Sequence, residues 1–277
     1  MPRENLRLCY TGRLRNALHE LILSARHNKI IMKRKTNPKT MKIISIGGGK
    51  LALRQTLPLD RFVVGLARKK RPRALFIPTA SGDDTDYCEI FDRIYGGKLN
   101  CQIDCLKLLG RNGERKHLAK RILAADLIYV GGGNTMRMMK LWRKIGVDKL
   151  LRRAGRQGTI LTGLSAGAIC WHRWGHSDSM SFSADDRQWS HIRVRSLDFI
   201  PHLYCPHLDG EKRHDSLVAM LRRGEMAVAC DNNAAIFYGP HGARCITSRK
   251  RARTHVYRKS HEGVTVTSYQ DGETIDL

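Results

Sequence analysis

The stretch ILTGLSAGAICWH, residues 160–172, holds the pattern that decides both the fold and the chemistry of this chain. An apolar run ends at Gly163, Ser165 follows among small residues, and a helix-like segment begins directly after it. Gly163 to Gly167 matches G-x-S-x-G, the pattern of a nucleophilic serine on a sharp strand-to-helix turn. The alternative is a small serine in a tight turn without chemistry. In this context we expect Ser165 to be a nucleophile, with the N–H of Ala166 facing a developing oxyanion.

Strand-like runs alternate with helix-like segments on the N-terminal side of this stretch. The runs are KIISI (42–46), ALFIPTA (74–80), QIDCLKLL (102–109), DLIYV (126–130) and TILTGL (159–164). Such alternation predicts βαβ units with right-handed crossovers and a parallel sheet covered on both faces. We therefore expect an α/β fold, a three-layer sandwich with a mainly parallel sheet. After residue 225 short strands follow one another without helices, which predicts antiparallel C-terminal additions at the sheet edge.

The composition is that of a folded protein. The length of 277 residues and the hydrophobic content of 42% are enough for a substantial core. No run approaches the roughly 18 apolar residues of a membrane span, and the start of the chain has no apolar segment typical of a signal peptide. The eight cysteines contain no C-x-x-C pair. A reducing, cytoplasmic location is the simplest expectation.

The formal net charge of +25 is unusual for a metabolic enzyme and typical of proteins that meet nucleic acid or anionic surfaces. Residues 1–40 hold ten Lys or Arg and two acids, and they predict a basic N-terminal extension that is disordered or weakly helical. A transit peptide, or a natural start at Met41, are the alternatives. Residues 41–277 are expected to form the domain. Its basic clusters match no common nucleic-acid-binding module, so the charge allows nucleic acid as a partner without favouring it.

Glycine-rich turns after predicted strands are the places where a ligand would bind, because sites in open α/β sheets lie beyond the carboxyl ends of the strands. IGGGKLA (46–52) fits no nucleotide-binding pattern and reads as a tight turn. IPTASGDDTDY (77–87) reads as a polar helix start, with cation binding by its aspartates as the alternative. YVGGGNTMRMM (129–139) is more informative. Its backbone N–H groups precede a helix and could approach an anionic group closely, as an oxyanion hole requires.

A serine nucleophile needs a histidine as base and an acid that orients it. The segment IPHLYCPHLDGEKRHD (200–215) offers His202, His207 and His214, and the position of His207 on a turn after an apolar run favours it. A metal site built from Cys205, His207 and Asp209 is the alternative, although its spacing fits no common pattern. The acid could come from several aspartates between the serine and the histidine, and the residues alone do not choose among them. These aspartates are Asp178, Asp185, Asp186 and Asp198.

Three segments occur in one order and spacing: IYVGGGNTMRMMKLW (128–142), TGLSAGAICWH (162–172) and CPHLDGE (205–211). Together they resemble the peptidase E family of serine peptidases, which contains alpha-aspartyl dipeptidase and, more distantly, cyanophycinase. The resemblance extends over about residues 41–245. It implies a sheet like that of class I glutamine amidotransferases, with serine where those enzymes carry cysteine. It also implies a Ser-His-acid site.

Carried over by motif, the family's nucleophile falls on Ser165, its histidine on His207 and its acid on Asp178, in GHSDSM. The same resemblance implies the remaining site residues. The oxyanion donors fall on the GGN turn and on the residue after the nucleophile: Gly132, Gly133, Asn134 and Ala166. The chain departs from the dipeptidase after SAGA, where it has Ile169, Cys170 and Trp171. This departure puts strict aspartyl specificity in doubt.

The expected function is a serine peptidase that hydrolyses short peptides, with an aspartyl N-terminus as the implied preference, through a Ser-His-Asp triad and an acyl-enzyme. Arg173 is the candidate cation for an aspartyl side chain. We expect no cofactor and no metal, a small peptide as the partner, and no membrane; a homodimer is left open. One alternative is cleavage of a β-linked Asp-Arg polymer, as by cyanophycinase. The other is a protein of the same fold that binds nucleic acid or a ligand without catalysis.

Overall fold

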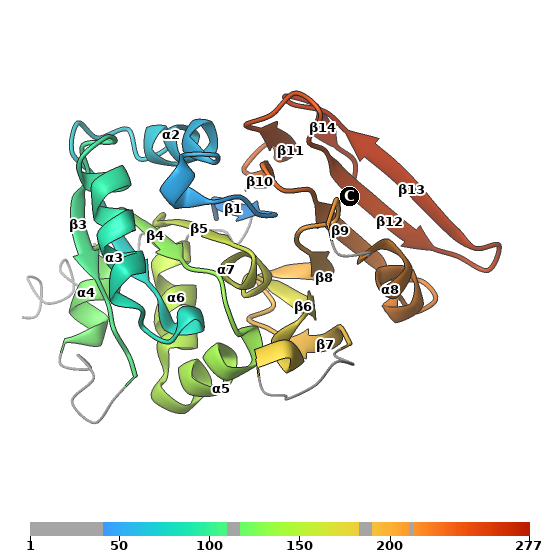
Figure 1. Cartoon of the computed structure of the whole chain (residues 1–277), viewed down its shortest axis with the longest axis horizontal. Coiled ribbons are helices and arrows are strands. Elements are labelled where there is room, and N and C mark those ends of the chain that lie inside the picture. The colour runs from blue at the N-terminus through green and yellow to red at the C-terminus, as the bar shows by residue number, and fades with distance from the viewer. Residues whose placement is uncertain (1–40, 110–116, 183–189, 211–212) are drawn as a thin grey trace, which may run out of the picture. The chain divides into compact units, whose positions relative to one another are not determined.

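Eight strands form the larger of two sheets, in the order β14-β11-β10-β1-β5-β4-β2-β3 (Figure 1). Its five parallel strands are those of the predicted alternation of strands and helices. The computed structural model describes residues 41–109, 117–182, 190–210 and 213–277. Strands β1, β5, β4, β2 and β3 run parallel, while β10, β11 and β14 extend the sheet antiparallel from β1. The bounds are β1 Ile43–Ile46, β2 Arg73–Ile77, β3 Gln102–Cys105, β4 Leu127–Val130, β5 Ile160–Leu164, β10 Ala234–Gly239, β11 Gly242–Thr247 and β14 Thr274–Ile275. The α/β class is confirmed.

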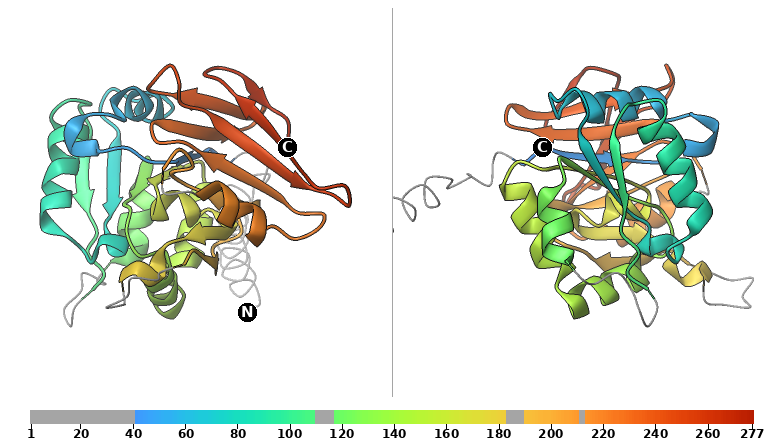
Figure 2. Two further views of the ribbon diagram at one scale, coloured as in Figure 1. Left: turned by 45° about the vertical axis from the view of Figure 1, so that its right-hand side comes forward. Right: turned by 90° about the vertical axis from the view of Figure 1, so that its left-hand side faces the viewer.

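A second sheet of six strands, in the order β13-β12-β9-β8-β6-β7, differs from the single sheet that the sequence predicted. Strands β6, β8 and β9 are parallel, and β7, β12 and β13 are antiparallel to their neighbours. Figure 2 shows the long β12–β13 hairpin at one side of this sheet. The bounds are β6 His172–Ser177, β7 Ile192–Arg195, β8 Ile200–Cys205, β9 Met226–Cys230, β12 Thr254–Lys259 and β13 Val264–Tyr269. The antiparallel additions are therefore divided between two sheets.

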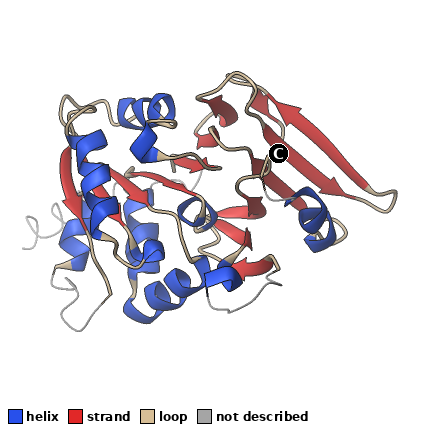
Figure 3. Ribbon diagram, viewed as in Figure 1, coloured by secondary structure: helices blue, strands red, loops and turns tan. Residues whose placement is uncertain are grey.

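Helices gather around the parallel strands (Figure 3). Along β4 the side chains alternate, so that Ile128 and Val130 join one buried cluster while Leu127 and Tyr129 join another. The first cluster includes Trp142 and further residues of α4, α5 and α6, and the second includes residues of α2 and α3. The α-helices are α2 Leu57–Gly65, α3 Thr85–Phe91, α4 Leu118–Ala124, α5 Thr135–Ile145, α6 Val147–Arg156, α7 Ala166–Ile169 and α8 Arg213–Met220. Shorter turns are the 3-10 helices η2 Leu51–Leu53, η3 Thr79–Ser81 and η5 Ser179–Phe182 and the π-helix η4 Asp92–Gly96.

The segment after Ser165 was expected to continue as a helix through ICWH, but α7 is only one turn long. The backbone of Trp171 instead accepts hydrogen bonds from the amides of Phe199 and Ile200, and β6 begins at His172. Cys170 and Trp171 are fully buried in the core. The residues that depart from the dipeptidase pattern therefore pack inside the protein, and they do not line a surface where a substrate could bind.

The N-terminal segment, membrane spans and the cysteines were the subjects of three further expectations. Residues 1–40, expected to be a basic extension, lie outside the described residues. Within the described part of the chain, no helix is both long and apolar enough to cross a membrane. The structure pairs Cys88 with Cys105 in a disulfide.

Candidate active site

Ser165 lies in a strained turn between β5 and α7. Its φ of 55° and ψ of −115° are unusual for a residue with a side chain. The two glycines of G-x-S-x-G make this turn possible. A Cβ on Gly163 would lie 2.3 Å from the carbonyl oxygen of Gly167, and one on Gly167 would lie 2.0 Å from that of Val130. Only glycine fits at both positions, which is the geometry that a nucleophile elbow requires.

The end of β1 holds both candidate catalytic residues. The amide of Ser165 donates to the carbonyl of Ile46 over 3.1 Å, and the amide of His207 donates to that of Gly47 over 3.2 Å. Ser165 follows β5 and His207 follows β8, so each stands at the carboxyl end of a parallel strand. The structure thus brings Ser165 and His207 to consecutive residues of one strand end, in the region where α/β proteins bind ligands.

The imidazole of His207 rests on the glycine turn after β1. His207 itself has a φ of 51°, and a Cβ built on Gly48 would lie 2.2 Å from Nδ1 of the ring. The same atom would lie 2.2 Å from Oδ1 of Asn232. Gly48 also forms a parallel β-bridge with Asn232. The IGGGKLA turn, which the sequence predicted to be only a tight turn, therefore leaves the space that the imidazole occupies.

The residue that faces Nδ1 of His207 is Asn232. Its Oδ1 lies 2.8 Å from Nδ1. Behind it, Oδ1 of Asp209 accepts hydrogen bonds from the Nδ2 group and from the backbone amide of Asn232, both at 2.8 Å. Neither Asn232 nor this role of Asp209 was found from the sequence. The available signal was the pair of polar residues directly after β9, at a strand end in the same sheet as the strand before His207.

The predicted acid, Asp178, does not fill this position. Its Oδ2 accepts from the guanidinium of Arg213 at 3.1 Å, and Arg213 is only 1% exposed. Asp198 pairs with Arg173 instead, at 2.9 Å. The prediction of Asp178 as the acid is therefore wrong, and the reason is a long-range contact: Asp178 follows β6, and the buried cation it meets is the first residue of α8. The alternatives Asp185 and Asp186 lie outside the described residues.

Arg173, the candidate cation for an aspartyl substrate, is held by the same ion pair. Its Nε donates to Asp198, and the two side chains are partly exposed. The other two histidines considered as base also have different surroundings. Nδ1 of His214 bonds to the hydroxyl of Tyr257 at 2.8 Å, and burial lowers the pKa of His202. Of the three histidines, His207 is the one whose amide is bonded to the end of β1.

The GGN turn after β4 is divided between two roles. A Cβ on Gly132 would lie 3.4 Å from Cβ of Ser165, so this glycine is beside the elbow. Gly133 packs against the carbonyl of Ala80, and Asn134 is the N-cap of α5, where its side chain accepts from the amide of Arg137 at 2.9 Å. The structure thus brings Gly132 to Ser165, whereas Gly133 and Asn134 hold the turn. Ala166, the other predicted oxyanion donor, follows Ser165 as the first residue of α7.

Tyr87 covers the GGN turn and was not singled out from the sequence. A Cβ on Gly131 would lie 2.9 Å from its ring, so the ring packs against this turn. Burial raises the pKa of Tyr87 to about 12, so its hydroxyl stays protonated at neutral pH. Tyr87 lies in the first turn of α3, in the DYCEIF segment. A neutral tyrosine therefore packs against the glycine turn that contains the predicted oxyanion donor.

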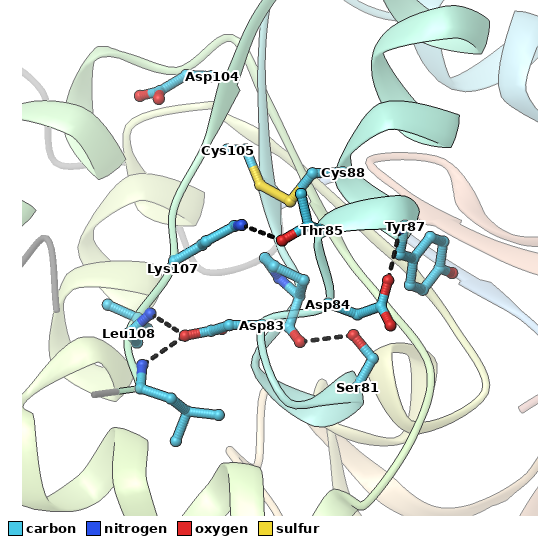
Figure 4. The surroundings of a disulfide bond; sticks show 12 residues. Ser81, Asp83, Asp84, Thr85, Tyr87, Cys88, Asp104, Cys105, Lys107 and Leu108 are labelled. Carbon is cyan, nitrogen blue, oxygen red and sulfur yellow. Dashed lines mark hydrogen bonds between the residues drawn. A yellow bond between two sulfur atoms is a disulfide. The ribbon is translucent and has the colours of Figure 1, made fainter.

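The turn that carries Tyr87 is tied to the segment after β3 (Figure 4). Asp84 caps α3 by accepting from the amide of Tyr87 at 2.7 Å. Asp83 accepts from the amides of Leu108 and Leu109, and the Cys88–Cys105 disulfide lies one residue beyond Tyr87. Asp84 therefore starts the helix, as the sequence predicted for IPTASGDDTDY, while the anchoring of the later loop by Asp83 was not predicted. Within the described ranges, no group of three or more His, Cys, Asp or Glu side chains could hold a metal ion.

A parallel α/β sheet, a serine on a strained strand-to-helix turn, a neighbouring glycine turn and a histidine at the same strand end are features that hydrolases combine. The comparison with protein families agrees with this class. Residues 13–246 match peptidase family S51, and the chain belongs to this family. The family and the relatives together place it among peptidase E-like proteins, and the chain is a peptidase by family.

Similar proteins include one curated relative and several solved structures. The relative is uncharacterized peptidase YgaJ of Bacillus subtilis (strain 168), 33% identical over 227 residues that are 80% of this chain and 94% of YgaJ. A peptidase from an acI-B1 Actinobacterium superposes with a TM-score of 0.65 at 18% identity, covering 86% of this chain and 97% of that one. A Listeria monocytogenes EGD-e protein named as a peptidase E has a TM-score of 0.56 at 19% identity, covering 75% and 98%. Each of these two structures shares the fold of this chain.

Proposed function

We propose that the protein is a serine peptidase that cleaves short peptides through an acyl-enzyme. Nε2 of His207 takes the proton of Ser165 Oγ as the oxygen attacks the peptide carbonyl. The amides of Gly132 and Ala166 donate to the oxyanion that forms. Collapse breaks the C–N bond, and the imidazolium gives its proton to the leaving amine. Water then attacks the ester, again with His207 as base, and releases the acid and the free serine.

The observation that carries this proposal is the backbone of Ser165. A φ of 55° on a residue with a side chain costs free energy, on the order of 1–3 kcal/mol, which a structural serine has no reason to require. The two glycines that flank it touch neighbouring backbone so closely that no other residue fits. The close backbone contacts at Gly163 and Gly167 therefore hold Ser165 in its strained conformation. This turn places Ser165 at the strand end where the amide of His207 is also bound.

The substrate class is proposed from the family and from the overall charge of the chain. An aspartyl preference needs a cation, and Arg173 is already bonded to Asp198. We therefore propose short peptides as substrates and keep the N-terminal aspartyl residue as the implied preference of the family. The excess of basic residues favours acidic peptides electrostatically. The predicted three-layer, glutamine-amidotransferase-like arrangement, the cytoplasmic location and a homodimer stay predictions.

The test is hydrolysis of a panel of Asp-Xaa and other Xaa-Xaa dipeptides, with Ser165→Ala as the matched variant. The wild-type protein is expected to hydrolyse members of the panel, and the variant to lose about 10⁴-fold or more in kcat/KM. A fluorophosphonate probe should label the wild-type protein and leave the variant unlabelled. Equal hydrolysis by both proteins would exclude the serine mechanism.

Two alternatives are separated by the same samples. Product analysis with isoaspartyl-Arg peptides distinguishes cleavage of a β-linked Asp-Arg polymer from dipeptide hydrolysis. A protein that only binds nucleic acid would show affinity for DNA or RNA that falls steeply with salt, together with no labelling by the probe. The strained Ser165 favours the enzyme, because binding to phosphates does not need it.

A further inference from the structure

The position beside the base, which holds an acid in a Ser-His-Asp triad, is occupied by the amide of Asn232. We propose that Asn232 and Asp209 act together as the positioning group of His207: Asp209 orients the amide, and the amide orients the imidazole. This inference rests on the proposed role of Ser165 and His207. It assigns to a pair of side chains the task that one carboxylate performs in a Ser-His-Asp triad.

The direction of the Asn232 amide is set by Asp209. An amide presents an acceptor oxygen on one side and donor hydrogens on the other, and the two ends are told apart by their partners. A carboxylate only accepts, so the end of Asn232 that faces Asp209 must be the Nδ2 group, 2.8 Å away. The backbone amide of Asn232 donates to the same oxygen at 2.8 Å. The oxygen of the amide is thereby turned toward His207.

The direction of the amide in turn sets the tautomer of His207. Oδ1 of Asn232 accepts and cannot donate, so the hydrogen of the 2.8 Å contact must belong to Nδ1 of the imidazole. A neutral imidazole with its hydrogen on Nδ1 has its lone pair on Nε2. This is the form that can remove the serine proton. The carboxylate of Asp209 therefore determines, through one intervening side chain, which nitrogen of His207 acts as the base.

The arrangement differs from a Ser-His-Asp triad in its electrostatics. A carboxylate in contact with the imidazole would favour the imidazolium and raise the pKa of the base, whereas here the contacting group is neutral and the charge of Asp209 is one residue further away. The other carboxylate of this segment, Asp231, is bonded elsewhere: it accepts from the amide of Arg253 at 2.9 Å and lies 3.3 Å from Nε2 of His255. Asp209 is thus the carboxylate bonded to Asn232.

The two side chains can be exchanged to test this proposal. In the double variant Asn232→Asp/Asp209→Asn, the carboxylate touches the imidazole and the amide stands behind it. The probe is a fluorophosphonate, and the readout is its labelling rate from about pH 5 to about pH 9. Asn232→Ala is expected to label about a hundredfold more slowly, and Asp209→Asn roughly tenfold more slowly. The double variant should recover to within about tenfold of the wild-type labelling rate. The acidic limb of its pH–rate profile, where the rate falls as His207 becomes protonated, should move to higher pH by about one unit.

The control is Asp231→Asn, which removes a carboxylate next to Asn232 in sequence but outside the contact with His207. Its acidic limb should coincide with that of the wild-type protein. Thermal unfolding of every variant shows whether a slow rate reflects loss of folded protein, and the movement of the limb in the double variant is an effect that a purely structural role would not produce.

Two results would overturn the proposal. One is labelling of Asn232→Ala and Asp209→Asn at the wild-type rate, above all if Asp178→Asn is labelled much more slowly. The other is a double variant whose acidic limb stays in place. Either result leaves the proposed function standing if Ser165→Ala remains unlabelled, because that variant tests the nucleophile alone.

Discussion

The two halves of the candidate active site are built in opposite ways. The nucleophile comes from five consecutive residues, Gly163 to Gly167, whose glycines make the close contacts that its turn needs. The base comes from three distant segments: the glycine turn after β1, the residues after β8 and the residues after β9. In the first half the partners are backbone carbonyls, and in the second they are side chains. A local motif can be found in the sequence, whereas a site assembled by the sheet cannot.

The difference predicts that the halves fail differently when their glycines are replaced. The largest effect is expected for Gly167→Ala, because its Cβ would lie 2.0 Å from the carbonyl oxygen of Val130, a backbone atom of a central strand that cannot move aside. We expect loss of folded protein or destabilisation by several kcal/mol, measured as soluble yield and thermal unfolding.

Gly65 provides the matched control for this substitution. It lies in α2, and nothing is within 4 Å of its Cβ position. Gly65→Ala should leave folding intact or stabilise it by about 0.5–1 kcal/mol, since alanine favours a helix. A Gly167→Ala protein as stable as Gly65→Ala would contradict the elbow geometry.

The second effect tests the half that carries the base. In Gly48→Ala the new methyl group would meet the imidazole of His207 and the amide oxygen of Asn232, each 2.2 Å away, and both are side chains that can rotate. The fold is expected to survive with a melting temperature close to that of the wild-type protein. Activity and fluorophosphonate labelling should fall about a thousandfold, because the base loses its orientation. A variant with full activity would show that His207 is not the base.

The smallest effect concerns the support beneath the glycine turn. Thr56 packs against Gly49, and its hydroxyl donates to the buried Asp60, whose other oxygen accepts from Tyr95. Burial raises the pKa of Asp60 from 3.8 to about 7. The native state therefore holds a proton that the unfolded state has released, and the free energy of unfolding must fall as pH rises from about 4 to about 7.

Comparison with Asp60→Asn isolates this contribution. Urea unfolding at about pH 5 and about pH 8 should show the wild-type protein losing roughly 2 kcal/mol relative to the variant over this range. A difference that does not change with pH would mean that Asp60 is ionised in the native protein at both values. Labelling by the probe should be altered little, since Asp60 makes no contact with His207.

The sequence predicted the parts of the molecule that are local. The parallel strands, Ser165 and the GGN turn follow from apolar runs and glycine spacing within a few residues. His207 was predicted from its place on a turn and from family resemblance, and the structure puts its amide at the end of β1. What could not be predicted was pairing over long distances. That Asp178 would meet Arg213, and that Asn232 would meet His207, depends on how β6 to β9 assemble into a second sheet.

The bonds of Ser165 to Ile46 and of His207 to Gly47 have a mechanical consequence. Two neighbouring residues of one chain are joined by a rigid peptide unit, with a fixed spacing of about 3.8 Å between Cα atoms. Thermal displacement of the end of β1 therefore carries both groups in the same direction. A displacement that both residues share does not change the separation of their backbones. The end of β1 therefore couples the backbone positions of Ser165 and His207 through a single peptide unit.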